Sequence, residues 1–433
     1  MKKHLLAITL IASGITAMSA QGLEHPFHHA HSSGHSYLAP NDSLAREAYE
    51  HNAPAEFYIP GKRHLTVHSN DNRFHLTIGG YAKLTAGVDF GSPIDNSNEF
   101  IVSAIPMHLA PGNGAQFNIS AMQSHLYFNF VAMPGEVNQI GVFIGANFLS
   151  NYNPSLQFAY MKFRGFEAGY DYSLFSDPGA GVPTIDYEGP NAFTALPTVV
   201  AGYSHTLGKN RRWSVGGGIE APAYSVTPGN DAAAVTQRVP DIPVWARYSW
   251  NRGDSWVRLS AVVRNLIYHD GVSRKNVDKV GWGVQLSGKS TVAPNLTAYW
   301  QGVYGNGIAS KMQDLSGLGL DMTPDSGLPG GEMNLVPAWG AYMGLQYDFS
   351  RSVYCSMTYS HIRTYADRYN HVVDGGTAWA DQYRYGQYAV ANVFWNITPV
   401  IQTGVEYIYG RRVNYGGDQA HDNRLQCMVQ LNF

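Results

Sequence analysis

Apolar and polar residues alternate along most of the chain from residue 73 onward. In residues 73–90, Phe74 and Leu76 fall on one parity, and His75 and Thr77 fall on the other. A period of two places successive side chains on opposite sides of an extended backbone, which is typical of a β-strand with one apolar and one polar face. This segment therefore predicts a strand that separates an apolar environment from a polar one.

The end of the chain, residues 423–433, repeats the pattern with Leu425 on the apolar parity and Arg424 on the polar one, and it stops on Phe433. An apolar face that ends on an aromatic residue suits a strand of a membrane barrel, whose outer face meets lipid. We expect this strand to pair with residues 73–90, because an open edge in lipid leaves backbone groups unpaired. Phe433 should then lie at the periplasmic rim and serve as the signal for the barrel-assembly machinery.

The same alternation predicts fourteen further strands, which makes sixteen in all. They are residues 117–131, 139–148, 156–164, 166–173, 198–207, 212–221, 242–250, 255–268, 279–289, 295–305, 338–349, 352–365, 383–395 and 400–411. An even number of strands is the rule for bacterial barrels of this kind. Parity slips near residues 121–122, within the second of the predicted strands.

The connections between these strands alternate between short and long. The short ones are 132–138, 165, 208–211, 251–254, 290–294, 350–351 and 396–399. The long ones are 91–116, 149–155, 174–197, 222–241, 269–278, 306–337, 366–382 and 412–422. Short periplasmic turns and long extracellular loops segregate in this way in outer-membrane barrels, whereas a soluble β-sandwich has no such rule. The chain is therefore predicted to be all-β, a sixteen-stranded antiparallel transmembrane β-barrel.

The first 72 residues differ from the rest. Residues 1–20 have a basic start, an apolar stretch and small residues before Gln21, which predicts a secretory signal peptide. Residues 21–72 are rich in histidine and proline and predict a periplasmic extension, with one short helical candidate at 43–50. The predicted domains are therefore 1–20, 21–72 and the barrel at 73–433.

Five histidines gather near the start of the extension, and two hypotheses for them stay open. They are His25, His28, His29, His31 and His35. Clustered imidazoles suit Zn, Cu or Ni. However, no fixed ligand spacing or carboxylate partner repeats among them, so a solvated extension without metal is the alternative. The rest of the chain suggests no cofactor.

Composition and charge narrow the function classes. After the first twenty residues no stretch of 18 residues is apolar throughout, which excludes helical membrane spans. Removing Lys2 and Lys3 with the signal peptide takes the formal net charge from −3 to −5, a mild value that does not suggest a nucleic-acid partner. Cys355 and Cys427 both fall on the apolar parity of their strands, where they are expected to be separate outward-facing residues; a disulfide is the alternative.

The polar parity of the strands carries more basic than acidic residues. The charged residues expected to face the lumen are Lys83, Lys162, Arg247, Arg258, Arg264, Arg384 and Arg424, with Glu220 and Glu406. An Arg or Lys on the lipid face costs about 2–4 kcal/mol near the midplane, so these side chains should point inward. A net basic wall favours anions. The alternative is that these charges pair with one another and only hold the barrel in shape.

The third long loop, residues 174–197, carries Asp177, Asp186 and Glu188 together with four prolines. A barrel of sixteen strands encloses an aqueous channel, and something must narrow it if passage is to be selective. A stiff acidic loop that folds inward would narrow it and would face the basic wall. The alternative is an ordinary surface loop.

Several short segments, in the same order, resemble the DcaP-like outer-membrane porins. They are residues 74–84 (with Ile78-Gly79-Gly80-Tyr81), 168–177, 185–191, 240–243, 281–284 and 404–411. The resemblance implies a trimer of sixteen-stranded barrels that passes small, often anionic, solutes across the outer membrane of a Gram-negative bacterium. In this chain His125 follows Ser124 where an Arg is usual in the family, so a pore-lining charge at that position would depend on pH.

These observations predict an outer-membrane porin that allows passive diffusion of small hydrophilic, anionic solutes. Its expected partners are outer-membrane lipid, the solutes and two further copies of the chain. A structural or adhesive barrel that binds a partner through its long loops, above all 306–337, is the alternative. No G-x-S-x-G or H-E-x-x-H motif is present, so the sequence does not indicate an enzyme, although a triad need not be local in sequence.

Overall fold

The computed structural model describes residues 52–54, 65–71, 73–229, 231–324, 332–366 and 379–433. The predicted signal peptide, the histidine cluster and the short helical candidate at 43–50 lie outside the described residues.

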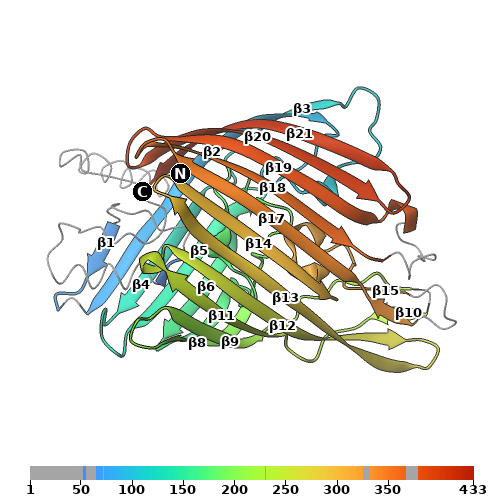
Figure 1. Ribbon diagram of the computed structural model, residues 1–433, viewed down its shortest axis with the longest axis horizontal. Helices are drawn as coiled ribbons and strands as arrows, with labels where there is room; N and C mark the ends of the chain where they lie inside the picture. The colour runs from blue at the N-terminus through green and yellow to red at the C-terminus, as the bar shows by residue number, and fades with distance from the viewer. Residues whose placement is uncertain (1–51, 55–64, 72, 230, 325–331, 367–378) are drawn as a thin grey trace, which may run out of the picture.

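The described chain forms a closed antiparallel β-barrel (Figure 1). Nineteen strands join its sheet, of which β1 (Leu65–His68) and β10 (Ala232–Ala234) are short additions, while β3 (Ala115–Ser120) and β4 (His125–Ala132) are two halves of one barrel strand. The barrel therefore has sixteen strands, as predicted. The others are β2 (Phe74–Gly91), β5 (Ile140–Ser150), β6 (Asn153–Phe163), β7 (Phe166–Tyr172), β8 (Pro197–Leu207), β9 (Trp213–Glu220), β11 (Ile242–Trp250), β12 (Ser255–Asp270), β13 (Lys275–Ala293), β14 (Leu296–Asn306), β17 (Pro337–Asp348), β18 (Val353–Thr364), β19 (Tyr383–Asn396), β20 (Ile401–Asn414) and β21 (Gln419–Asn432).

A small hairpin and a few single-turn helices complete the secondary structure of the described residues. The hairpin pairs β15 (Met322–Pro324) with β16 (Met333–Leu335). The 3-10 turns are η2 (Val102–Ala104), η3 (Pro178–Ala180), η4 (Asn251–Gly253), η5 (Ala309–Lys311), η6 (Gln313–Leu315) and η7 (Trp379–Asp381). Among the described residues, no helix is long and apolar enough to cross a membrane.

The predicted slip in parity is an interruption of the second barrel strand. β2 pairs with β3 as far as Thr85↔Ser120 and then with β4 from Tyr81↔His125, so four residues of one strand oppose three of the other. The extra residue is a β-bulge, which bends the strand and shifts the inward parity from even-numbered residues in β3 to odd-numbered residues in β4.

The barrel closes between β2 and β21, the first and last strands, as expected. Their register runs from Tyr81↔Asn432 to Gly91↔Asp422, and Gly80 exchanges both backbone hydrogen bonds with Phe433. Beyond Phe433, β1 takes the place of β21 beside β2, with Leu65 opposite Ile78. Residues before the predicted barrel start at 73 thus protect the edge that the last strand leaves open.

Three extracellular connections are shorter than the sequence analysis predicted. The connection at 149–155 is a two-residue turn in which Asn151 and Tyr152 both have positive φ, at 51° and 63°. Two positive φ angles suit a tight hairpin, because the turn then twists with the strands. The connections at 271–274 and 415–418 are also short, because the strands on both sides extend beyond the predicted ends.

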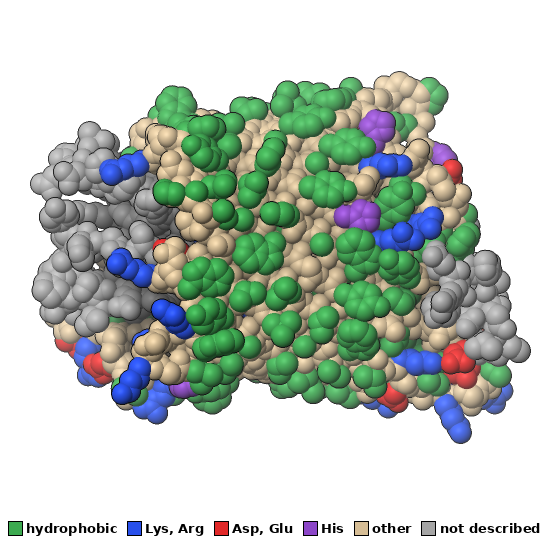
Figure 2. Space-filling view, in the orientation of Figure 1, with side chains coloured by type: hydrophobic (Ala, Val, Ile, Leu, Met, Phe, Trp, Pro, Cys, Tyr) green, Lys and Arg blue, Asp and Glu red, His purple; other side chains and the backbone are tan. Residues whose placement is uncertain are grey.

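The outer surface is apolar and carries the exposed parity of the strands. Leu84, Val280 and Val405 are each 50% exposed or more, as are many other apolar side chains of the same parity. Figure 2 shows these hydrophobic side chains covering the middle of the barrel, with charged side chains gathered near its ends. Cys355 and Cys427 lie on this surface as free thiols, which confirms their predicted outward placement without a disulfide.

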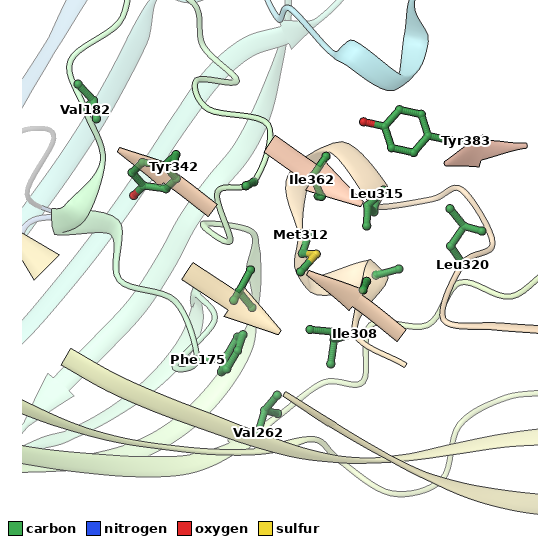
Figure 3. Packing of buried hydrophobic residues seen from close by; sticks show 14 of the residues in the cluster. Phe175, Val182, Val262, Ile308, Met312, Leu315, Leu320, Tyr342, Ile362 and Tyr383 are labelled. Carbon is green, nitrogen blue, oxygen red and sulfur yellow. The ribbon is translucent and has the colours of Figure 1, made fainter. Parts of the chain in front are cut away.

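Much of the interior is packed with loops rather than open. Phe175 and Ala192 of the third long loop and Met312 and Leu315 of the connection after β14 form one apolar cluster with Tyr342 of β17 (Figure 3). A second cluster joins the first long loop to inward residues of β19 to β21. Burial of a Leu, Phe or Met side chain contributes about 1.5–3 kcal/mol, so these loops are held to the wall by a core of their own.

Candidate functional site

The third long loop runs along the inner wall of the barrel. Near its middle, the Glu406 carboxylate accepts hydrogen bonds from the backbone N–H groups of Ile185 and Asp186 at 2.7 and 2.8 Å. The Lys83 ammonium donates to the carbonyl oxygen of Ile185 at 3.0 Å, and the Ser356 hydroxyl donates to that of Pro183 at 2.8 Å. Side chains of β2, β18 and β20 therefore hold the backbone of this loop directly.

The first part of the loop is held by strands further round the barrel. Asp177 accepts from the Trp256 indole at 3.0 Å and from the Ser287 hydroxyl at 2.6 Å. Arg258 donates to the carbonyl oxygen of Leu174 at 2.6 Å. The loop thus follows the wall from β12 to β2 through β20, and its Tyr187 hydroxyl also accepts hydrogen bonds from Asn147 of β5 and Gln157 of β6.

The acidic side chains of the loop are turned into the packing. Asp186 is buried and accepts from the Phe100 backbone N–H at 2.8 Å and from the Tyr388 hydroxyl at 2.9 Å. Burial raises the pKa of Asp186, and burial together with nearby carboxylates raises the pKa of Glu188 well above its ordinary value. A raised carboxyl pKa favours the neutral form. The Asp186 carboxylate is therefore engaged within the packing of the loops.

A group of inward-facing cations and indole rings lies on β11 to β13, and we call it the basic-aromatic patch: Arg247, Arg258, Lys289, Trp245 and Trp256. The Arg247 guanidinium lies over the Trp256 ring at 4.1 Å, and that of Arg258 lies over the Trp245 ring at 4.6 Å. Lys289 lies 5.7 Å from the Trp256 ring. Arg247 is half-buried, so the ring covers one face of its guanidinium and leaves N–H groups toward water. The Arg258 side chain is only 12% exposed and donates to Leu174 and Ser260.

A glycine, Gly216 of β9, lies in the wall beside the basic-aromatic patch. A Cβ added at Gly216 of β9 would lie 2.6 Å from the Trp245 ring. The absence of a side chain there makes room for the indole that supports Arg258. Lys162 and Glu167, on β6 and β7, form a partly exposed ion pair at 3.7 Å nearby.

Other inward charges are buried as pairs. Arg424 donates to both oxygens of Asp89 at 2.6 and 2.7 Å, across the closing pair of strands. Arg264 contacts Asp241 at 3.1 Å and Asp321 at 3.2 Å. Both arginines have side chains at most 1% exposed, so they hold strands and loops together and do not face water.

A second group of buried charges surrounds the Arg264 pair. The Lys311 ammonium forms ion pairs with Glu220 and Asp241, the second at 2.9 Å. Lys311 lies in the connection after β14, while Glu220 ends β9. Glu220, predicted to face inward, therefore joins a loop to the wall.

Two predicted pore residues lie at other levels of the interior. His125 is buried beside Tyr81, with ring centroids 5.9 Å apart. Arg384 lies at the extracellular start of β19, 6.0 Å from the Tyr415 ring. Of the predicted pore-lining residues, the structure brings Arg247 and Arg258 together, places Lys162 nearby and spreads the others around the wall.

Several residues of the site were not predicted. Trp245, Trp256 and Lys289 fall on the inward parity, and that parity was the signal that could have found them. Lys311 gave no such signal, because it lies in a loop without alternation. No group of three or more His, Cys, Asp or Glu residues able to hold a metal occurs in the part of the chain that the structure describes.

Part of the N-terminal extension also reaches the inner wall. The Tyr160 hydroxyl donates to the carbonyl oxygen of Asn52 at 2.6 Å, and Ala53 packs with Tyr127 and Phe143. A Cβ added at Gly141 would lie 1.9 Å from the Asn52 side chain. Residues 52–54 therefore pack against the inner face of β4 to β6 in the periplasmic half of the barrel.

Replacing Gly141 with valine is expected to displace residues 52–54, because the new side chain would take the place of Asn52. If these residues narrow the periplasmic entrance, single-channel conductance should rise. Deletion of residues 21–54 should have the same effect. Gly302→Val is the matched control, since a Cβ at Gly302 meets no atom within 4 Å. Equal conductance in the wild type and the three variants would show that residues 52–54 do not narrow the channel.

Comparisons with known proteins agree with this architecture. The model of the porin subfamily (Porin_2) matches residues 145–426. The chain is similar to the outer membrane channel DcaP of Acinetobacter baumannii, with a TM-score of 0.70 and 17% identity over 85% of this chain and 99% of that one. It also resembles the anion-selective porin from Comamonas acidovorans, with a TM-score of 0.50 and 8% identity over 83% of this chain and 100% of that one.

No curated protein sequence matches the chain. At these identities the structural likenesses show the fold, whereas the family match covers well over half of the sequence. The chain therefore belongs to the porin subfamily, and it is a passive channel of the bacterial outer membrane.

Proposed function

We propose that this porin passes small hydrophilic solutes with a preference for anions, and that the basic-aromatic patch sets the preference. The observation that carries the proposal is the half-buried guanidinium of Arg247, which lies over the Trp256 ring on the inner wall beside the more deeply buried Arg258. Guanidinium groups bind carboxylates and phosphates through paired N–H groups. One protein of the same fold is an anion-selective porin, which fits the proposal.

The charge around the patch supports a modest preference. Asp177 lies 4.0 Å from Arg258 and offsets part of its charge. Arg247 donates to the Ser249 hydroxyl at 3.1 Å and has no carboxylate within ion-pair distance among the described residues. The Asp186 side chain is buried and that of Glu188 is half-buried, so neither is a fully exposed carboxylate. Arg247 is therefore the cation whose charge is most available to a passing anion.

The double variant Arg247→Glu/Arg258→Glu is expected to reverse the selectivity. Two positive charges become two negative ones beside the narrowed path, so the ratio of chloride to potassium permeability should fall from above one to below one. Reversal potentials in planar bilayers with a salt gradient measure this ratio. Arg351→Glu, in an exposed periplasmic turn, is the control and should leave the ratio unchanged. An unchanged ratio in the double variant, with the barrel folded, would refute the role of the patch.

We also propose that the protein assembles as a homotrimer, as its resemblance to DcaP-like porins implies. The apolar outer surface can serve both lipid and neighbouring copies. Sedimentation or mass photometry in detergent should give three times the mass of one chain, and a monomer at membrane-like protein-to-lipid ratios would contradict the proposal. We further propose that the protein acts as a channel and catalyses no reaction, because the family to which it belongs consists of porins.

The adhesive alternative receives less support. The described part of the connection at 306–337, on which it relied, contributes Ile308, Met312 and Leu320 to the core inside the barrel. Those residues cannot meet a partner outside the cell while they are buried there.

A further inference from the structure

A row of basic and imidazole side chains crosses the outside of the barrel near its extracellular end. His361 of β18 pairs with Gln387 of β19, Gln387 pairs with Arg411 of β20, and Arg411 pairs with His421 of β21. Direct register partners point to the same face, so the four side chains lie in one row across four neighbouring strands. Arg363 is two residues further along β18 on the same face. We call these five residues the outer row.

The outer row lies on the lipid-facing parity and not in the lumen. Tyr359 and Met357, which precede His361 on the same face of β18, are 51% and 59% exposed. The intervening residues Ser360 and Ile362 are buried. Figure 2 shows Lys, Arg and His side chains gathered at one end of the apolar surface, over the end of the barrel opposite the C-terminus.

The level of the outer row matches the upper edge of the membrane. Gln387 is eight residues from Trp395, which lies at the periplasmic end of the same face of β19. At about 3.3 Å per residue and a tilt of about 40°, this distance is about 20 Å along the membrane normal. The apolar band of outer-membrane barrels is about 25 Å tall. The outer row therefore stands where hydrocarbon gives way to lipid headgroups of the outer leaflet.

Aromatic rings surround the row on the same surface. The His361 ring lies 5.1 Å from Trp339 and 5.6 Å from Tyr385, and His421 lies 6.3 Å from Tyr409. Aromatic girdles mark the interface in such barrels, which supports the placement of the row.

The cations of the row have neutral protein partners only, within the described residues. Arg411 donates to Gln387 at 3.4 Å and to Gln419, and Arg363 lies 4.8 Å from the Tyr365 ring. No carboxylate lies within ion-pair distance of either guanidinium in the part of the chain described. Two guanidinium groups at a membrane surface without protein counter-ions suit an anionic ligand that arrives with the membrane.

We propose that the outer row binds the phosphate groups of a phosphorylated lipid of the outer leaflet. Arg363 and Arg411 lie on strands two apart and two residues out of register, which separates their backbones by about 12 Å. They can therefore hold two phosphates of one headgroup, or one phosphate each of neighbouring lipids. His361, Gln387 and His421 donate or accept between them, and the aromatic rings pack against the upper parts of the acyl chains.

Binding of diphosphoryl lipid A is the direct test. Protein stripped of lipid and placed in phosphatidylcholine nanodiscs is titrated with diphosphoryl lipid A or with its dephosphorylated form, and bound lipid is counted by native mass spectrometry. The wild type should prefer the diphosphoryl form by about tenfold or more, since charge-assisted contacts are among the stronger hydrogen bonds. Arg363→Gln/Arg411→Gln should lose that preference.

Matched controls separate the site from general charge and from misfolding. Arg211→Gln/Arg351→Gln removes two cations from exposed periplasmic turns and should retain the preference. Both double variants should keep wild-type conductance and ion selectivity, which shows that the barrel is folded and that the channel does not depend on the row.

Four outcomes would overturn the proposal. The first is equal affinity of the wild type for the two lipids. The second is an unchanged preference in Arg363→Gln/Arg411→Gln. The third is displacement of the lipid by millimolar inorganic phosphate alone, which would mark a site for the free anion. A change of oligomeric state in the variant without loss of lipid would instead assign the row to contacts between copies, and it would also overturn the proposal.

Discussion

Replacing Glu406 with leucine is expected to detach the centre of the third long loop and to raise single-channel conductance well above that of the wild type. The Glu406 carboxylate accepts four hydrogen bonds, from the backbone N–H groups of Ile185 and Asp186 and from the side-chain amides of Asn392 and Gln426. Hydrogen bonds to a charged group contribute about 1.5–3 kcal/mol each, and leucine can accept none of them. Planar-bilayer recordings measure the effect.

The stability of the Glu406→Leu variant depends on Lys83. Its ammonium is buried and donates to Ile185, so loss of the nearby carboxylate leaves a buried cation without its counter-charge. Removing one partner of a buried pair is more destabilising than removing both. The double variant Lys83→Met/Glu406→Leu should therefore fold more stably than Glu406→Leu while keeping the higher conductance.

Glu136→Leu, in an exposed periplasmic turn, is the control and should leave conductance unchanged. A folded Glu406→Leu barrel with wild-type conductance would mean that the packing of Phe175, Val182 and Ala192 holds the loop without the carboxylate.

Alternation was sufficient to predict the strands and the direction of their side chains. Arg424 illustrates this: its inward parity and its place in the closing strand both follow from the sequence, and its register partner across the closure is Asp89. The burial of Arg424 did not follow from the sequence. An inward side chain faces water only if no loop covers it. Arg424 is covered by the first long loop, and its guanidinium donates to the carbonyl oxygen of Asn96 in that loop at 2.8 Å.

The contacts of the interior loops with the barrel wall could not be predicted from the sequence. Ile308, Met312 and Leu315 lie in a long connection, and their apolar side chains have no period that predicts which wall they meet. Their placement depends on contacts between residues far apart in the chain, such as the hydrogen bond from the Ser103 backbone to Asp314 at 2.8 Å. Burial raises the pKa of Asp314 to about 6, which shows how completely these loops exclude water.

The outer row shows a similar limit. His361 and Arg411 each fall on the apolar parity of a predicted strand, where a single polar residue is an exception to the pattern, and His421 lies in the predicted connection 412–422. Only the register of β18 to β21 shows that the exceptions lie side by side.

Arg264→Met should cause the largest loss of stability among substitutions on the inner wall. Arg264 is fully buried and donates to Asp241, to Asp321 and to the carbonyl oxygens of Gly307 and Ala223. It therefore joins β12 to the connections before β11 and after β14. Without it, Asp321 would lose its ion-pair partner, and Glu220 and Asp241 would share the ammonium of Lys311. Breaking a buried ion pair by removing one partner costs about 3–5 kcal/mol.

Unfolding in urea from lipid vesicles measures the loss as a lower midpoint at an unchanged slope, and proteolysis between residues 308 and 321 reports local detachment of the loop. Lys279→Met is the matched control, because its ion pair with Glu332 at 2.9 Å is exposed and should contribute no more than about 1 kcal/mol. Adding Asp321→Asn to Arg264→Met should restore part of the stability, since one unpaired carboxylate is removed. If Arg264→Met lowers the free energy of unfolding no more than Lys279→Met and exposes no cleavage site, the cluster does not hold the loop, and the apolar packing around Met312 must do so alone.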